Sequence, residues 1–176
     1  MINELGMIQV YTGDGKGKTT ASLGLAFRAC GHGLKVLMVQ FMKGDHEYGE
    51  IKAEKYLPGL EIKQVGRDCF VNFADPDPID VGMLQDGWQL AKEAILSKKY
   101  DMVILDEINV AMYAKLLPVS EVVDFLKNND LKQVEVVLTG RMAPDEIIEI
   151  ADLVTEMREI KHYFSKGIHS RDGFDH

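Results

Sequence analysis

The sequence is short of cysteine and of long apolar runs. It has two cysteines in 176 residues, Cys30 and Cys69, and their spacing fits neither a disulfide framework nor a metal-binding pattern. No apolar run is long enough to cross a bilayer, and residues 1–6 lack the basic region and apolar core of a secretory signal. We therefore expect a cytoplasmic protein with reduced cysteines and no membrane contact.

Positive charge is also scarce. Lys and Arg together number 20 against 28 Asp and Glu, which gives a formal net charge of -8. Proteins that bind nucleic acid usually present a basic face to its phosphates, and the sequence has no Lys/Arg cluster of that kind. This balance favours small-molecule ligands and no nucleic acid. The length and the 46% hydrophobic content are typical of one globular domain.

Glycine, in contrast, is concentrated in residues 11–20. An apolar segment at 7–11 precedes this stretch, and apolar residues at helical spacing follow it over 21–29. That is the strand, loop and helix context of a phosphate-binding loop, in which glycines let backbone N–H groups converge on phosphate oxygens. Lys18 would supply positive charge and the Thr19 hydroxyl would ligate Mg²⁺. The predicted nucleotide-binding residues of the loop are Gly13, Asp14, Gly15, Lys16, Gly17, Lys18, Thr19 and Thr20.

The loop departs from the usual G-x-x-x-x-G-K-[ST] pattern at its first position. The pattern puts a glycine five residues before Gly17, but Thr12 stands there and Gly13 comes one residue late. The alternative interpretation is a glycine-rich turn that binds nothing. Residues 17–20 and the flanking elements favour a phosphate-binding loop, and the offset glycine predicts a variant that holds its nucleotide in its own way.

A second motif is the apolar run at residues 100–107, which ends in Asp106 and Glu107. In phosphate-binding-loop proteins a strand of this kind delivers an acid to the magnesium ion. Mg²⁺ keeps several waters, so one carboxylate, Thr19 and phosphate oxygens would suffice as ligands. The alternative is that both acids cap a helix beginning near Ile108. The presence of the phosphate-binding loop favours the metal role.

Strands and helices alternate along the chain. Strands are predicted at 35–41, 60–65, 100–107, 134–141 and 153–157, and a helix is predicted at 83–98 among others. Nearly continuous apolar strands are typical of a parallel sheet covered on both faces. The sequence therefore predicts a single-domain α/β fold of the P-loop type over residues 1–176, with a mostly parallel sheet and helices on both faces. Residues 158–176, which contain three histidines, are predicted to form a solvated tail.

Several side chains follow the predicted strands, at the edge where open α/β sheets place ligands. The irregular stretch 66–78 carries Phe70 and Phe73, which either contact a flat apolar ligand or cap the core beneath the loop. Arg141 either faces the ligand cleft or lies on the surface. Lys43 has the same two interpretations, and for Lys43 the solvated loop position is favoured.

Taken together, these motifs resemble the ATP:corrinoid adenosyltransferases of the type often called CobA or BtuR. The similarity lies in residues 10–20, 31–33, 39–44, 103–107, 138–141, 151–157, 161–162 and 167–168, which covers nearly the whole chain in order. It implies a RecA-like fold, usually a homodimer, and transfer of the 5′-deoxyadenosyl group of ATP to the Co(I) of a reduced corrinoid with release of triphosphate. The corrinoid would be cobalamin or a cobinamide-type precursor, and an electron-donor flavoprotein is a candidate partner.

The resemblance also implies roles for single residues. Lys18 and Glu107 are implied as catalytic, Lys18 at the triphosphate and Glu107 at a Mg²⁺ or Mn²⁺ ion that it would share with Thr19. Asp106 is the alternative acid or supports Glu107. Arg141 joins the loop residues in binding nucleotide.

For the corrinoid, the resemblance points to the loop after the third strand. Phe70 matches the first of the aromatic residues that crowd the lower face of the corrinoid in the family. Two residues on, related proteins have a tryptophan where this chain has Asn72, with Phe73 beside it. Phe70 and Phe73 are therefore the predicted corrinoid-binding residues.

A P-loop ATPase or small-molecule kinase is the alternative function. Such an enzyme would use Lys18, Thr19 and the acid pair to cleave ATP at its γ-phosphate. It would also need a residue that orients water or an acceptor hydroxyl, and no motif in the sequence marks one. A nucleotide-binding regulatory module without turnover is a third interpretation.

Overall fold

The computed structural model describes residues 6–69 and 71–175, and within them the chain forms a six-stranded sheet. All strand pairs in it are parallel, and the order is β3-β2-β4-β5-β1-β6. The strands are β1 (Ile8–Thr12), β2 (Val36–Phe41), β3 (Leu60–Val65), β4 (Met102–Asp106), β5 (Glu135–Thr139) and β6 (Leu153–Glu156). The predicted parallel sheet is therefore confirmed.

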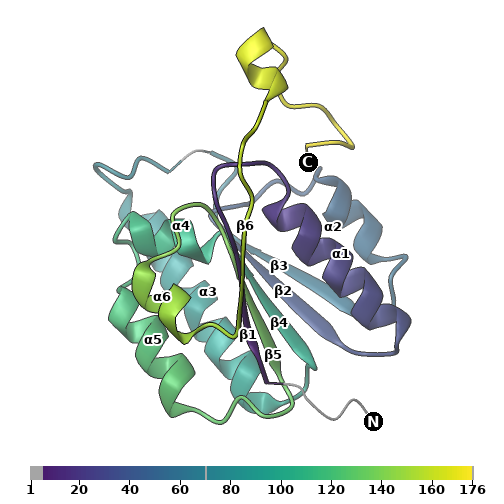
Figure 1. The fold of residues 1–176 in the computed structure, drawn as a ribbon, viewed down its shortest axis with the longest axis vertical. Helices are drawn as coiled ribbons and strands as arrows, with labels where there is room; N and C mark the ends of the chain where they lie inside the picture. Colours follow the sequence, from purple (N-terminus) through teal and green to yellow (C-terminus); the bar gives the residue numbers. More distant parts are fainter. Residues whose placement is uncertain (1–5, 70, 176) are drawn as a thin grey trace.

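Helices cover the two faces of this sheet (Figure 1). One face carries α1 (Lys18–Gly31) and α2 (Gly49–Glu54), and the other carries α3 (Pro78–Ser97), α4 (Ile108–Tyr113), α5 (Val119–Asn128) and α6 (Asp145–Ile150). After β6 the chain leaves the sheet, forms the short 3₁₀ helix η1 (Tyr163–Lys166) and turns back toward α1 and α2. None of the helices in the described ranges is both long enough and apolar enough to cross a membrane.

The central strands are apolar along their whole length because both of their faces are covered. In β4, Met102 and Ile104 pack on the α1 side, in a cluster that includes Ala26. Val103 and Leu105 point the opposite way and pack against the layer of α3 to α6. The two-residue alternation of a strand thus builds two cores, and Asp106 continues the side that faces α1.

β5 separates β1 from β4, since β5 pairs with both of these strands. The phosphate-binding loop follows β1, and the acid pair stands at the end of β4. Because all strands run the same way, their carboxyl ends share one edge of the sheet, and the end of β5 lies between the two motifs. Thr139, the last residue of β5, lies opposite Tyr11 of β1 and donates a hydrogen bond to Asp106 of β4.

Helix α3 begins earlier than the sequence pattern predicts. It starts at Pro78 rather than at Met83, and the Asp77 side chain caps it by accepting a hydrogen bond from the backbone N–H of Ile79 at 2.9 Å. The apolar stripe marks only the part of α3 that faces the core, because its first turn leaves Ile79 largely exposed. An acidic cap followed by proline was the local signal for the true start.

Candidate active site

The loop between β1 and α1 wraps around the amine of Lys18. Gly17 stands at the N-cap of α1, and Lys18 is the first helical residue. The Lys18 Nζ donates hydrogen bonds to the carbonyl oxygens of Gly13 and Gly15, both at 2.7 Å. Burial lowers the pKa of Lys18, and the nearby Glu107 carboxylate partly offsets this. The cation is therefore held inside the loop, where the N-terminus of α1 also favours an anion.

The shifted glycine of the loop has a structural reason. Thr12 remains in β1, and its Oγ1 accepts a hydrogen bond from the backbone N–H of Ala143 at 3.1 Å. The chain turns only at Gly13, whose φ is +96° and whose position leaves no room for a Cβ, which would lie 2.5 Å from the carbonyl oxygen of Met157. Gly15 donates its N–H to that same oxygen at 2.7 Å. Met157, the residue directly after β6, thus supports the loop through its carbonyl oxygen.

Asp106 is completely buried and lies at the centre of a group of donors. Its Oδ1 accepts hydrogen bonds from the hydroxyls of Thr19, at 2.9 Å, and Thr139, at 2.6 Å. Its Oδ2 accepts from the Lys43 Nζ at 2.7 Å, and the Gln40 amide lies at 3.5 Å. We call these five residues the Asp106 cage. Both carboxylate oxygens are occupied, so Asp106 fixes its neighbours in place.

Glu107 differs from Asp106 because it faces the cavities of the site. Its backbone N–H donates to the Thr139 Oγ1 at 3.1 Å, and its φ of +65° is a left-handed conformation that is unusual for a non-glycine residue. Burial raises the pKa of the Glu107 carboxyl, the adjacent Asp106 charge raises it further, and Lys43 and Lys18 partly offset the rise. Unlike Asp106, Glu107 lines two of the cavities described next.

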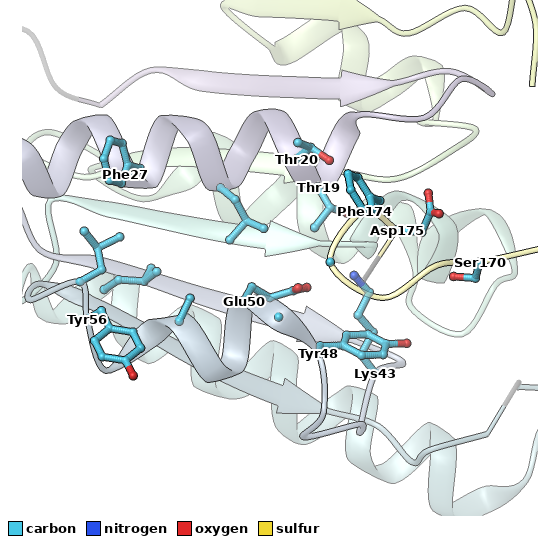
Figure 2. A pocket seen from close by; sticks show the side chains of 16 residues that line it. Thr19, Thr20, Phe27, Lys43, Tyr48, Glu50, Tyr56, Ser170, Phe174 and Asp175 are labelled. Atoms are coloured by element: carbon cyan, nitrogen blue, oxygen red, sulfur yellow. The ribbon is translucent and has the colours of Figure 1, made fainter.

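Three cavities reach this edge of the sheet, and one of them extends away from it between α1 and α2. The phosphate cavity, of about 320 Å³, is lined by residues 15–20, Glu107 and Arg141 among others. The loop cavity, of about 470 Å³, lies between the segments that follow β2 and β3. The helix cavity, of about 630 Å³, lies between α1 and α2 (Figure 2). Lys43 lines all three cavities, so they meet at its side chain.

Two predicted loop residues do not line the phosphate cavity within the described part of the chain. Gly13 contributes its carbonyl to Lys18 instead, and the side chain of Asp14 is exposed to solvent. Phe73 lies on the loop cavity, where it is 48% exposed. The predicted Phe70 lies outside the described residues.

The loop cavity is built by two close-packed segments. A Cβ on Gly44 would lie 2.4 Å from the carbonyl oxygen of Gly66, so the chain after β2 can touch the chain after β3 only without a side chain there. Arg67 then anchors the second segment to α3. Its Nε and Nη2 each donate to the Asp80 carboxylate at 2.7 Å, and Nη2 also donates to Asp77 at 3.0 Å. This fork fixes the start of the loop that carries Phe73.

Comparison with known proteins decides the family. A family model described as ATP:corrinoid adenosyltransferase BtuR/CobO/CobP matches residues 4–176. The chain belongs to this family. A corrinoid adenosyltransferase from Sinorhizobium sp is 42% identical over 174 residues, which cover 98% of this chain and 81% of that protein. One from Escherichia coli (strain K12) is 40% identical over 175 residues, covering 99% and 87%.

Solved structures agree on the fold. The flagellar accessory protein FlaH from Methanocaldococcus jannaschii superimposes with a TM-score of 0.58 at 17% identity, covering 86% of this chain and 71% of FlaH. At this identity the likeness shows the fold alone. Together with the strand order, it confirms the predicted P-loop fold of the RecA-like type.

The donors at the phosphate cavity of this adenosyltransferase-family chain fit a divalent cation. Thr19 and Glu107 offer a hydroxyl and a carboxylate, the hard oxygen ligands that Mg²⁺ prefers, and both line the cavity. Across residues 6–69 and 71–175, no group of three or more His, Cys, Asp or Glu side chains could hold a metal by itself. An ion bound here would therefore complete its coordination with phosphate oxygens and water, as Mg²⁺ commonly does.

The structure also brings in residues that sequence reasoning set aside. Lys43 was favoured as a solvated loop lysine, but its amine forms the ion pair with Asp106. The C-terminal tail was expected to be solvated, yet Asp175 forms an ion pair with Lys16 of the phosphate-binding loop at 2.8 Å. The position of Lys43 directly after β2, at the edge of the sheet where ligands bind, indicates a place in the site. The Asp175 contact joins opposite ends of the chain, and no local pattern marks it.

Proposed function

We propose that this protein transfers the 5′-deoxyadenosyl group of ATP to the Co(I) centre of a reduced corrinoid and releases triphosphate. Co(I) supplies the electron pair of the new Co–C5′ bond, and the C5′–O bond breaks with its electrons going to the triphosphate. The observation that carries the proposal is the meeting of the three cavities at Lys43. This arrangement gives the triphosphate leaving group and the Co(I) nucleophile separate cavities on either side of Lys43.

This chemistry needs few catalytic groups. Co(I) is already a strong nucleophile, so no side chain has to activate it and no general base is required. The protein must align cobalt with C5′, for which effective molarity can supply ~7–11 kcal/mol. It must also stabilise the charge that develops on the departing oxygen, which fixed positive groups do efficiently in a water-poor site.

The residues of the phosphate cavity divide this work. Lys18 and the backbone N–H groups of the loop bind the triphosphate, and Arg141 adds charge at the cavity wall. Thr19 and Glu107 hold the Mg²⁺ or Mn²⁺ ion, which when bound would neutralise charge on the triphosphate. Asp106 acts as a positioning residue, because its two oxygens are already occupied inside the Asp106 cage.

Lys43 joins the proposed catalytic residues. Burial alone would lower its pKa, but the ion pair with Asp106 outweighs that effect and the pKa of Lys43 is raised. Its amine therefore stays protonated at neutral pH. It lies where the phosphate cavity meets the other two, so it can neutralise charge on the oxygen that leaves C5′.

The loop cavity suits the reacting face of the corrinoid. Val71 and Phe73 give it an apolar wall, while Glu107 and Lys43 connect it to the phosphate cavity. We assign Phe73 to contact with the macrocycle, and we keep Phe70 as a predicted contact. A complete cobalamin and a cobinamide-type precursor both present such a face.

Other properties are proposed on the family resemblance and the sequence. They are a homodimer, an electron-donor flavoprotein that reduces the corrinoid, and a cytoplasmic location. The alternative of a P-loop ATPase or kinase is not favoured, because the family match covers residues 4–176. It would also require an acceptor-orienting residue, which no motif supplies.

The test is an anaerobic reaction of the protein with Mg-ATP and chemically reduced cob(I)alamin. We expect adenosylcobalamin, seen by its absorption spectrum, together with intact triphosphate in equal amount. ADP and phosphate without a cobalt–carbon bond would show that the ATPase or kinase alternative is right.

A further inference from the structure

The described tail of the chain, residues 158–175, contacts the phosphate-binding loop at both of its ends. At its start, a Cβ on Gly15 would lie 2.8 Å from the backbone carbonyl carbon of Arg158, so the two backbones pass in close contact. Near its other end, the Asp175 carboxylate forms an ion pair with the Lys16 Nζ at 2.8 Å. The tail therefore runs from the loop out to η1 and back to the loop (Figure 1).

Tyr163 ties the two halves of the tail together. Its hydroxyl donates a hydrogen bond to Asp175, and the Arg171 guanidinium lies 4.5 Å from its ring centre. Arg171 also donates its backbone N–H to Asp175 at 3.0 Å. These contacts hold the residue before Tyr163, which is His162, beside the loop, and His162 lines the phosphate cavity.

His162 thus belongs to a cavity whose walls are mainly positive. The cationic side chains that line the cavity are Lys16, Lys18, Lys43 and Arg141. The acids on the same walls are Glu107, which is assigned to the metal ion, and Asp175, which is paired with Lys16. The ligand that suits these walls is a polyanion, so a hydrogen-bond donor from the tail would face phosphate oxygens.

The hydrogen bonding of the tail fixes the tautomer of His162. Its Nδ1 accepts a hydrogen bond from the backbone N–H of Phe164 at 3.1 Å, and this contact caps η1. A ring nitrogen that accepts a hydrogen bond carries no proton, so the neutral imidazole has its proton on Nε2. The Nε2–H group is therefore the donor that His162 can offer to the cavity.

We infer that His162 is a further triphosphate-binding residue, whose Nε2–H donates a hydrogen bond to a phosphate oxygen. The inference rests on the proposed function, because it takes the triphosphate of ATP as the ligand of the phosphate cavity. Negative charge grows on the triphosphate as the C5′–O bond breaks. A donor whose ring is fixed through its other nitrogen stabilises that charge without having to reorient.

Two substitutions of His162 separate the roles of its two nitrogens. In His162→Asn the side-chain oxygen can take the place of Nδ1 and keep the cap, since Asn is a favoured capping residue, but no group takes the place of Nε2. In His162→Gln the longer side chain can bring its NH₂ group to the place of Nε2, and the cap is lost. Binding of phosphate and capping of η1 therefore predict opposite rankings of the two variants.

The test measures the dissociation constant of inorganic tripolyphosphate by calorimetry, at a fixed Mg²⁺ concentration and without corrinoid. We expect His162→Asn to weaken binding roughly tenfold, the order of one lost hydrogen bond to a charged group. We expect His162→Gln to stay within about threefold of the wild type. The matched control is His169→Asn, which changes an exposed histidine of the same tail that lines none of the three cavities and should bind as the wild type does.

Binding by His162→Asn that equals the control would overturn the inference, and so would a loss in His162→Gln as large as that in His162→Asn. Nitrogen-15 nuclear magnetic resonance of the neutral ring is an independent check: the proton is expected on Nε2, and a proton on Nδ1 would contradict the assignment. A protein that shows the expected ranking with tripolyphosphate but forms no cobalt–carbon bond would refute the proposed function and leave the role of His162 standing.

Discussion

The Asp106 cage and the loop at residues 66–77 both shape the cavities at Lys43, but they are built differently. The cage is polar, three of its residues (Gln40, Asp106 and Thr139) are buried, and each carboxylate oxygen of Asp106 has its partners within it. Residues 68–69 and 72–75 of the loop are exposed, and the loop is fixed near its start by the Arg67 fork on α3. Groups that stabilise charge need fixed positions, whereas a surface that receives a large macrocycle can adapt. The proposed place of bond breaking therefore lies beside the hydrogen-bonded cage, and the proposed corrinoid contact lies on the exposed loop.

The largest expected effect comes from removing the cation inside the phosphate-binding loop. Lys18→Ala should lower kcat about 10²- to 10³-fold, as the loss of one fixed group that stabilises developing charge does in other enzymes. Single-turnover rates of adenosylcobalamin formation measure this. Lys161→Ala, an exposed lysine of the tail, is the control and should react at the wild-type rate. A Lys18→Ala protein as fast as the control would contradict the assignment.

Next come the two adjacent acids, which should separate stability from metal binding. Asp106→Ala removes the partner of Lys43 and should cost ~3–5 kcal/mol in the free energy of unfolding, because it breaks a buried ion pair. Glu107→Gln should leave the unfolding midpoint unchanged and lose Mn²⁺ binding in the presence of ATP. Urea unfolding and electron paramagnetic resonance of Mn²⁺ measure the two effects. Retained Mn²⁺ affinity in Glu107→Gln would reverse the roles given to these residues.

A smaller effect is expected from a substitution in the loop at residues 66–77. Arg67→Lys loses the two-pronged contact with Asp80 and should raise KM for the corrinoid several-fold while leaving KM for ATP unchanged. Steady-state kinetics with each substrate varied in turn measure this. Lys63→Arg, in an exposed ion pair with Glu61, is the matched control. An equal change in both KM values would mean that Arg67 supports the whole site.

The smallest expected effect is a shift in the pH dependence of Mn²⁺ binding. Burial and the neighbouring Asp106 charge raise the pKa of Glu107 above the ordinary value of 4.5. Because only the ionised carboxylate binds a cation, Mn²⁺ affinity should begin to fall, as the pH is lowered, at a higher pH than an ordinary glutamate would give. Titrations of Mn²⁺ at a series of pH values measure the midpoint. A midpoint at or below the ordinary value would show that burial does not govern this group.

Much of the fold could be predicted from the sequence because the strongest signals are local. The phosphate-binding loop, the apolar strand that ends at Asp106 and the alternation of strands with helices all lie in short stretches of chain. The start of α3 was missed because the apolar stripe marks the face of a helix that is buried, while Pro78 and Ile79 at its start are exposed. The Asp77 cap was the better guide.

The site could be predicted only in part, for physical reasons. Asp106 and Glu107 are neighbours of similar chemistry, and only the folded chain distinguishes them: Asp106 is enclosed by hydrogen-bond donors, whereas Glu107 lines two cavities. The hydrogen-bond partners of Asp106 come from β2, α1 and β5. Both of its oxygens therefore find partners only in the folded sheet. The contact between Asp175 and Lys16 likewise exists only once the chain ends meet.

The account predicts that cobalt and triphosphate lie on opposite sides of C5′ at the junction of the three cavities. The most direct test is the stereochemistry at C5′ when ATP carrying a single deuterium of known configuration at that carbon reacts with cob(I)alamin. Direct in-line displacement requires inversion, which nuclear magnetic resonance of the adenosylcobalamin product can detect. Inversion is the result that we expect. Retention would mean two successive displacements through an intermediate on the protein, and it would contradict the placement of both substrates.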